Sequence, residues 1–213
     1  MPLPVHAIAA NSKRLYDEAH QAFGEGRLAT ATALAIFSIE ESAKHAILKR
    51  QAKRPNLPPK RITRHEIKHQ EIGELFWYWA IYSVLSKTFQ DFHSFASTLP
   101  DADKETLDFI SRLSGGEAVD FLRYNMFKSE EEMRTYVHQN FPHPELLDIS
   151  ALGKSGAVEA LRKRCLYVDL SSDGSGILST PESVSQSDAI EWLKIAWFGQ
   201  EYIALANRVW GET

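Results

Sequence analysis

Apolar and polar residues alternate along this chain with the spacing of helices, so the pattern predicts an all-α protein. We expect helices at about residues 10–23, 28–53, 63–98, 157–165 and 187–208. The glycines of Gly24-Glu25-Gly26 end the first helix, and Pro55 ends the second. A short extended segment, 166–169, and a Ser/Gly-rich loop, 171–179, separate the last two. These elements predict a helical bundle.

The middle of the chain, residues 100–155, follows a different pattern. Its helical signals are short, and Gly115-Gly116, Pro142 and Pro144 interrupt them. We interpret this stretch as a helical insertion that elaborates the bundle. A chain of 213 residues can bury one full core, so we expect a single domain over residues 1–213.

Composition and charge indicate which partners and which cellular compartment to expect. The formal net charge is −4, so any attraction to nucleic acid has to come from a local patch. The single cysteine, Cys165, excludes an intrachain disulfide and fits a reducing cytoplasm. No signal peptide is read at the start, and the apolar run 75–85 is about half of a membrane span. We therefore expect a cytoplasmic protein without a membrane partner.

The third helix opens on a string that fits more than one chemistry, Arg64-His65-Glu66-Ile67-Lys68-His69. Arg64 and His69 suit RNA cleavage without a metal. The histidine can move the proton of the 2′-hydroxyl or of the leaving oxygen, and the arginine can stabilise the charge of the phosphorane. The helix opening favours an anion, and four basic residues cluster there: Lys60, Arg61, Arg64 and Lys68. They are either a solvated basic face after a proline loop or a patch that contacts RNA phosphates.

The same string also matches two metal motifs. His65 and His69 form the His-Glu-x-x-His pair of a zinc peptidase, and Glu66 with His69 has the spacing of carboxylate-bridged di-iron bundles. However, Thr63 and Glu66 also fit a capping box, which gives this glutamate a structural role. The third zinc ligand is missing from the extended motif, and Asp17-x-x-His20 is the only second di-iron candidate. We therefore predict no metal and no other cofactor.

Two glutamates, Glu40 and Glu41, interrupt two apolar stripes of the second helix at one level. A buried carboxylate costs several kcal/mol unless it is paired, so each should have a partner. One interpretation is a local i,i+4 pair of Glu40 with Lys44. The other is that the glutamates point across the bundle to the opening of the third helix. Four residues share one face there: His65, His69, Ile72 and Phe76.

Three segments in order resemble a known family. Residues 33–44 read Ala-Leu-Ala-Ile-Phe-Ser-Ile-Glu-Glu-Ser-Ala-Lys and are similar to the Ala-x-Leu-Ala-x-x-x-Ile-Glu-Glu-x-Gly-Lys segment of the AbiV abortive-infection family, with Ala43 at the usual glycine. His65-x-x-Lys68 resembles its His-x-x-Lys segment, and residues 163–169 resemble its Lys-x-x-Leu-Tyr-Val-Asp signature, followed as in the family by Ser179-Thr180-Pro181. Residues 100–155 contribute nothing to the resemblance.

The resemblance implies a helical bundle of the HEPN superfamily, whose members often dimerise and in many cases cleave RNA. Bacterial members of the family halt growth or translation of a phage-infected cell. Carried onto this chain, the superfamily's Arg-x4–6-His pair falls on Arg64 and His69, and the family's own pair falls on His65 and Lys68. The Glu-Glu-x-x-Lys segment falls on three further site residues: Glu40, Glu41 and Lys44.

These observations favour an antiphage toxin that acts as a metal-independent endoribonuclease. The alternatives are a non-catalytic protein that blocks translation by binding a phage or host factor, and a zinc metallopeptidase. Burial of Arg64 or His69 in a salt bridge would favour the binding protein over the nuclease. We also expect a homodimer, because Trp77, Tyr78 and Trp79 point around the whole third helix and need a cover, either residues 100–155 or a second subunit. An antitoxin is a further candidate partner.

Overall fold

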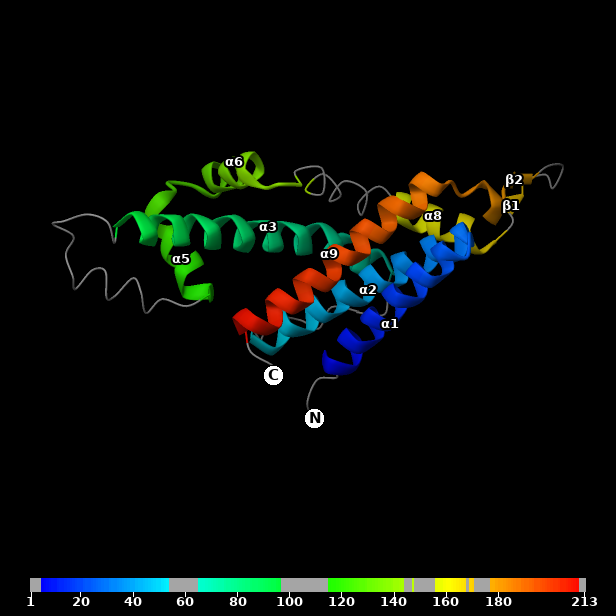
Figure 1. Ribbon diagram of the computed structural model, residues 1–213, viewed down its shortest axis with the longest axis horizontal. Coiled ribbons are helices and arrows are strands. Elements are labelled where there is room, and N and C mark those ends of the chain that lie inside the picture. Colours follow the sequence, from blue (N-terminus) through cyan, green and yellow to red (C-terminus); the bar gives the residue numbers. More distant parts are fainter. Residues whose placement is uncertain are drawn as a thin grey trace. The chain divides into compact units, whose positions relative to one another are not determined.

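The computed structural model describes residues 5–53, 65–96, 115–143, 147, 156–167, 169–170 and 177–210. The chain forms two compact units (Figure 1). The first comprises Met1–Leu75 and Asp148–Ala204, and the second comprises Phe76–Leu147 and Leu205–Thr213. The long helix α3, His65–Ala96, begins in the first unit and continues into the second.

Three helices lie side by side in the first unit: α1 (Val5–Gly24), α2 (Leu28–Lys53) and α9 (Gln186–Trp210), of which the last belongs to this unit as far as Ala204 (Figure 1). The turn between α1 and α2 follows from the glycines of the sequence. Gly26 has φ +74°, and Arg27 N donates to Ala22 O at 2.9 Å, which is the glycine-capped ending of a helix. The predicted stop at Gly24–Gly26 is therefore confirmed, and α2 has the bounds that were expected.

A short helix, α8 (Ala157–Leu166), packs against the beginning of α2. Cys165 of α8, Ala33 of α2 and Val184 form one buried cluster there. Between α8 and α9 the chain forms an antiparallel hairpin of β1 (Asp169–Leu170) and β2 (Ile177–Ser179), and then a single 3-10 turn, η2 (Pro181–Ser183). The sequence predicts an extended segment and a loop here, so the first strand was expected in part and the second strand was not predicted.

In the second unit, the continuation of α3 is joined by α5 (Gly115–Met126) and α6 (Glu130–Asn140). Trp79 packs edge-on against Phe141, with ring centroids 4.9 Å apart, and the guanidinium of Arg134 lies 4.8 Å from the ring centroid of Trp77. Residues from the middle of the chain therefore cover two of the three consecutive aromatic residues of α3.

The all-α prediction is confirmed, since α-helices carry the fold and one short hairpin is the only sheet within the described ranges. The first helix begins at Val5, earlier than expected, because Val5 and Ile8 pack on Leu48 and so belong to the bundle core. The single-domain assignment stays a prediction. No helix among the described residues combines the length and the apolar character needed to cross a bilayer.

Candidate functional site

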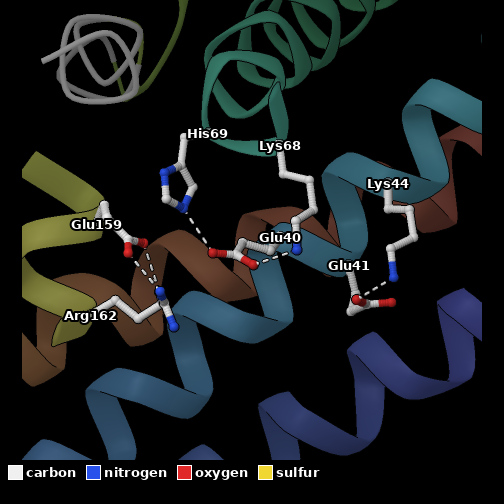
Figure 2. A network of polar contacts seen from close by, with 7 residues as sticks. All are labelled: Glu40, Glu41, Lys44, Lys68, His69, Glu159 and Arg162. Carbon is white, nitrogen blue, oxygen red and sulfur yellow. Dashed lines mark hydrogen bonds and ion pairs between the residues drawn. The ribbon is translucent and has the colours of Figure 1, made fainter. Parts of the chain in front are cut away.

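The carboxylate of Glu40, in the middle of α2, binds two consecutive residues of α3 (Figure 2). Lys68 Nζ donates to Glu40 Oε2 at 2.7 Å, and His69 Nε2 lies 2.7 Å from Glu40 Oε1. An ionised carboxylate only accepts, so the proton of this second bond is on His69 Nε2. The two donors leave both oxygens of Glu40 paired.

This cluster of Glu40, Lys68 and His69, here called the charged cluster, is closed to solvent. The three residues are 1%, 6% and 2% exposed. Removing charges from water costs several kcal/mol per ion, and only close pairing with further hydrogen bonds offsets that cost. The interpretation that Glu40 points across the bundle to α3 is therefore confirmed. His69, Ile72 and Phe76 are all buried, which agrees with the predicted inward face of α3.

A third helix contributes an ion pair beside this cluster, which was not among the predicted site residues. Arg162 of α8 binds Glu159 through two hydrogen bonds, of 2.8 Å from Nε and 2.6 Å from a terminal nitrogen (Figure 2). The pKa of Arg162 is raised, first by its bond to Glu159 and also by the negative charge of Glu40. The i,i+3 spacing of Glu159 and Arg162 was a signal for the pair. Their approach to Glu40 depends on how α8 packs on α2.

The neighbouring glutamate, Glu41, behaves differently. Its carboxylate accepts from Lys44 Nζ at 2.6 Å, and the side chains are 14% and 22% exposed. Of the two interpretations of Glu40, the local pair with Lys44 is therefore wrong. Lys44 binds Glu41 instead, because Glu40 faces the interior and already has two partners from α3 (Figure 2).

Several predicted site residues lie outside the described residues. They are Lys60, Arg61, Thr63 and Arg64, together with the side chains of His65 and Glu66. The structure thus brings together Glu40, Lys68 and His69 from the predicted set, and keeps Glu41 with Lys44 as a separate pair.

The described part of the chain contains no assembled metal site. No group of three or more His, Cys, Asp or Glu side chains there is arranged to hold an ion. His69 Nε2 faces Glu40, and the second di-iron candidate is used locally: Asp17 pairs with Lys13, while His20 Nε2 lies 2.8 Å from the hydroxyl of Tyr16.

Another face of α2 carries a neutral polar layer made by Ser12, Ser38, Ser42 and Gln200, here called the serine layer. Ser12 Oγ donates to the Ser38 carbonyl at 2.9 Å and lies 2.9 Å from Ser42 Oγ, and Gln200 Nε2 of α9 donates to Ser12 Oγ at 2.7 Å. These bonds join α1, α2 and α9. The hydroxyls satisfy one another, so this layer is a packing feature.

His45, also on α2, is fully buried, and neither ring nitrogen has a hydrogen-bond partner within the described ranges. Burial lowers its pKa to about 4, and the nearby charges of Lys49 and His6 act in the same direction. The imidazole is therefore neutral at pH 7 and belongs to the packing of α2.

These features define a class: a helical bundle in which a buried glutamate on the second helix ties down a lysine and a histidine of the third. The family model of AbiV, of the HEPN group, matches residues 4–197, and the chain belongs to this family. The matched range contains the charged cluster and the pair of Glu159 and Arg162. No curated protein and no solved structure matches the chain.

Proposed function

We propose that this protein is a cytoplasmic abortive-infection effector that stops the growth of a phage-infected cell by binding a phage or host factor. Membership of the AbiV family supports the part in abortive infection. The choice of binding over RNA cleavage rests on one observation, the burial of His69 and Lys68 on Glu40.

A general base must reach the proton that it removes, and a cation must reach the phosphate that it stabilises. His69 is 2% exposed and Lys68 is 6% exposed, and both are held by the same carboxylate. In this arrangement the charged cluster ties α3 to α2 and offers neither group to a substrate. That favours the binding protein, by the criterion of a salt-bridged His69.

The second candidate function is the metal-independent endoribonuclease, and the chemistry of the same cluster favours it. A carboxylate on one ring nitrogen orients a histidine, as in many acid-base sites, and Lys68 supplies a charge for phosphate. RNA would then be the partner, with phosphate contacts at Lys60, Arg61, Arg64 and Lys68. This function requires the pairs of Glu40 to open when RNA binds.

Arg64→Ala separates the two candidates, because the nuclease needs this arginine, whereas the binding protein as proposed assigns it no role. Plaque formation by a susceptible phage and cleavage of RNA by the purified protein are the measurements. We expect the wild type to reduce plaques without cleaving RNA, and Arg64→Ala to reduce them equally. Arg14→Ala is the matched control, since this exposed arginine of α1 pairs with Glu18.

RNA cleavage by the wild type that Arg64→Ala abolishes, with an unchanged melting temperature, would establish the nuclease instead. Stoichiometric zinc in the purified protein, with protection lost to a chelator, would support the third reading, a peptidase with His65 and His69 as ligands. An antitoxin is a further proposed partner, and co-expression of neighbouring genes tests for one.

A homodimer is also part of the proposal. The dimer was predicted because Trp77, Tyr78 and Trp79 need to be covered. Within the chain, however, Phe141 already contacts Trp79, and Arg134 contacts Trp77. A dimer therefore needs a different surface.

A further inference from the structure

Two adjoining hollows lie on the second unit, where the chain passes from α5 to α6 (Figure 1). The smaller has a volume of about 190 Å³ and is lined by Arg123 and Lys128, so it is here called the basic hollow. The larger has a volume of about 500 Å³ and is lined by Glu131 and Glu132, so it is here called the acidic hollow. Phe127 lines both and forms part of a shared wall.

The two cations of the basic hollow have no partner within the described ranges. Arg123 and Lys128 are exposed, and neither side chain makes a hydrogen bond or an ion pair there. Glu130 also lines this hollow, but it already pairs with Arg134 at 3.0 Å. The basic hollow therefore offers two positive charges to an acidic group from outside.

The acidic hollow has one carboxylate that the helix does not use. Glutamates in a first helical turn often serve the helix end, and two in α6 have such structural roles. Glu130 pairs with Arg134, and Glu132 accepts from the backbone nitrogen of Lys128 at 2.8 Å. The carboxylate of Glu131 has no partner among the described residues, so this hollow offers a negative charge to a basic group.

The wall between the hollows is aromatic and is held in place. The rings of Phe127 and Tyr136 lie 5.4 Å apart, and the hydroxyl of Tyr136 lies 3.1 Å from Thr88 Oγ1 of α3. Tyr124, which lines the basic hollow, is 77% exposed, the highest value for a large apolar residue in the described part of the chain. Tyrosine is enriched in protein interfaces, and a preformed surface lowers the cost of binding.

We propose that the two hollows dock an extended segment of a partner protein in which an acidic and a basic residue flank an apolar one. The acidic residue binds Arg123 and Lys128, the apolar residue packs on Phe127, and the basic residue binds Glu131. The inference rests on the proposed function, because the partner is the phage or host factor. It adds the surface that binds the factor and the chemistry of the bound segment.

The two opposite charges favour a polypeptide over a nucleic acid. Every phosphate of RNA or DNA is negative, so a strand that reaches the basic hollow would bring further phosphates towards Glu131 and Glu132. Like charges that face each other across a contact oppose association. A polypeptide can present both signs within three residues, which satisfies both hollows at once.

A synthetic peptide tests the charge order directly. The probe is Gly-Ser-Glu-Leu-Lys-Ser-Gly, titrated into the full chain while NMR follows the backbone amides of Phe127 and Ser129. We expect saturable shifts at both amides. Replacing either the glutamate or the lysine of the peptide by glutamine should weaken binding about threefold, as expected for one exposed ion pair.

Charge reversal in the protein tests which hollow binds which end. Arg123→Glu combined with Lys128→Glu should bind the Glu-Leu-Lys peptide about tenfold more weakly than the wild type does. The same variant should bind a Lys-Leu-Lys peptide more tightly than the wild type does, and this gain requires a folded protein. Lys87→Glu is the matched control, because Lys87 is an exposed lysine of the same unit that lines neither hollow.

Plaque formation then connects the hollows to the factor. The double variant Arg123→Glu with Lys128→Glu should lose plaque reduction, and Lys87→Glu should keep it. Retention by the double variant would overturn the inference and leave the proposed function intact. A wild type that reduces no plaques would contradict the proposed function, while the peptide titration still decides whether the hollows bind as described.

Three results of the titration would overturn the inference. The first is a wild type that binds none of the peptides. The second is equal binding of the peptide and its glutamine versions, which would remove the charge order. The third is displacement of the peptide by single-stranded oligouridine, which would assign the hollows to nucleic acid.

Discussion

The second helix carries two buried polar regions that differ in chemistry. The charged cluster joins α2 to α3 through Glu40, Lys68 and His69, and the serine layer joins α2 to α1 and α9. Both regions are satisfied by hydrogen bonds across helices. They differ in the cost of removing one member. A buried hydroxyl left without its partner lowers the free energy of unfolding little, whereas a buried charge left without its partner lowers it much more.

Beside the serine layer, the backbone of α9 lies close to side chains of α2. A Cβ atom placed on Gly199 of α9 would lie 2.6 Å from Ile39 Cδ1 and 2.7 Å from Ser42 Oγ, so a larger residue there would require one of these side chains to shift. Small neutral groups thus serve close packing, and the charged cluster serves orientation. The predictions below test this division, beginning with the largest effect.

Removing Glu40 should be the most damaging change to α2. Glu40→Ala leaves the Lys68 ammonium buried without its carboxylate, and we expect a loss of about 3–5 kcal/mol in the free energy of unfolding. Denaturant unfolding measures it. The control is Asp17→Ala, which breaks the exposed pair with Lys13 and should cost about 1 kcal/mol or less.

A second variant checks the reason for that loss. Replacing Glu40 and Lys68 together by methionine removes both charges, and stability should recover most of what Glu40→Ala loses. If the double variant is as unstable as the single one, the cost comes from lost packing and not from an uncompensated charge.

His45 sharpens the comparison, since it is a buried polar group of α2 in neither region. Its pKa of about 4 in the folded protein lies below the ordinary value of 6.5, so below pH 6.5 the unfolded chain binds a proton that the folded chain does not. Stability from this group is complete above pH 6.5 and falls as the pH drops towards 4, by about 3 kcal/mol.

The measurement is the free energy of unfolding between pH 7 and pH 4. His45→Leu should lose stability less steeply than the wild type over this range, because the carboxylates titrate in both proteins and only the wild type has the imidazole. Parallel pH profiles for the two proteins would show that His45 does not titrate as described.

Crowding the serine layer should have an intermediate effect. Gly199→Ala forces Ile39 or Ser42 to move, and we expect a loss of about 1–3 kcal/mol, although alanine is the better helix former. Adding Ile39→Val removes the closest methyl group and should restore part of the loss. Gly24→Ala is the control, because nothing lies within 4 Å of a Cβ at that glycine.

The smallest effect is expected at Glu41. Its i,i+3 pair with Lys44 is local to α2, so Glu41→Gln should change the free energy of unfolding by about 0.5 kcal/mol or less. Salt should weaken this contribution further. A loss as large as that of Glu40→Ala would mean that the two glutamates are not distinct.

Most of the fold was predictable because its signals are local. Apolar spacing and the glycine turn at Gly26 gave the helices of the first unit, with α2 at its observed bounds. Strand β2 was missed because Ile177 and Leu178 lie within a stretch read as a Ser/Gly-rich loop, and two or three residues are too few to show alternation.

The site was predictable only in part, because its decisive contacts join distant residues. Two carboxylates at one level of α2 already required partners, and the opening of α3 was the right place to find those of Glu40. Lys44 is four residues from Glu40 and three from Glu41, and a lysine can pair with a glutamate at either spacing. The rotation of α2 in the bundle decides that it pairs with Glu41. The position of Arg162 beside Glu40 depends on the docking of α8, which no local pattern encodes.

Glu40 also restricts the rotation of α3 about its own axis. Consecutive residues of a helix point about 100° apart around its axis, yet Lys68 and His69 both reach the one carboxylate. Few rotations of α3 allow this, so the two bonds set which way its neighbouring turn faces and direct Ile72 and Leu75 into the core, where each is 1% exposed. If α3 shifted along its axis by a single residue, Ile67 or Gln70 would stand opposite Glu40. The apolar face of the helix would then no longer point into the core.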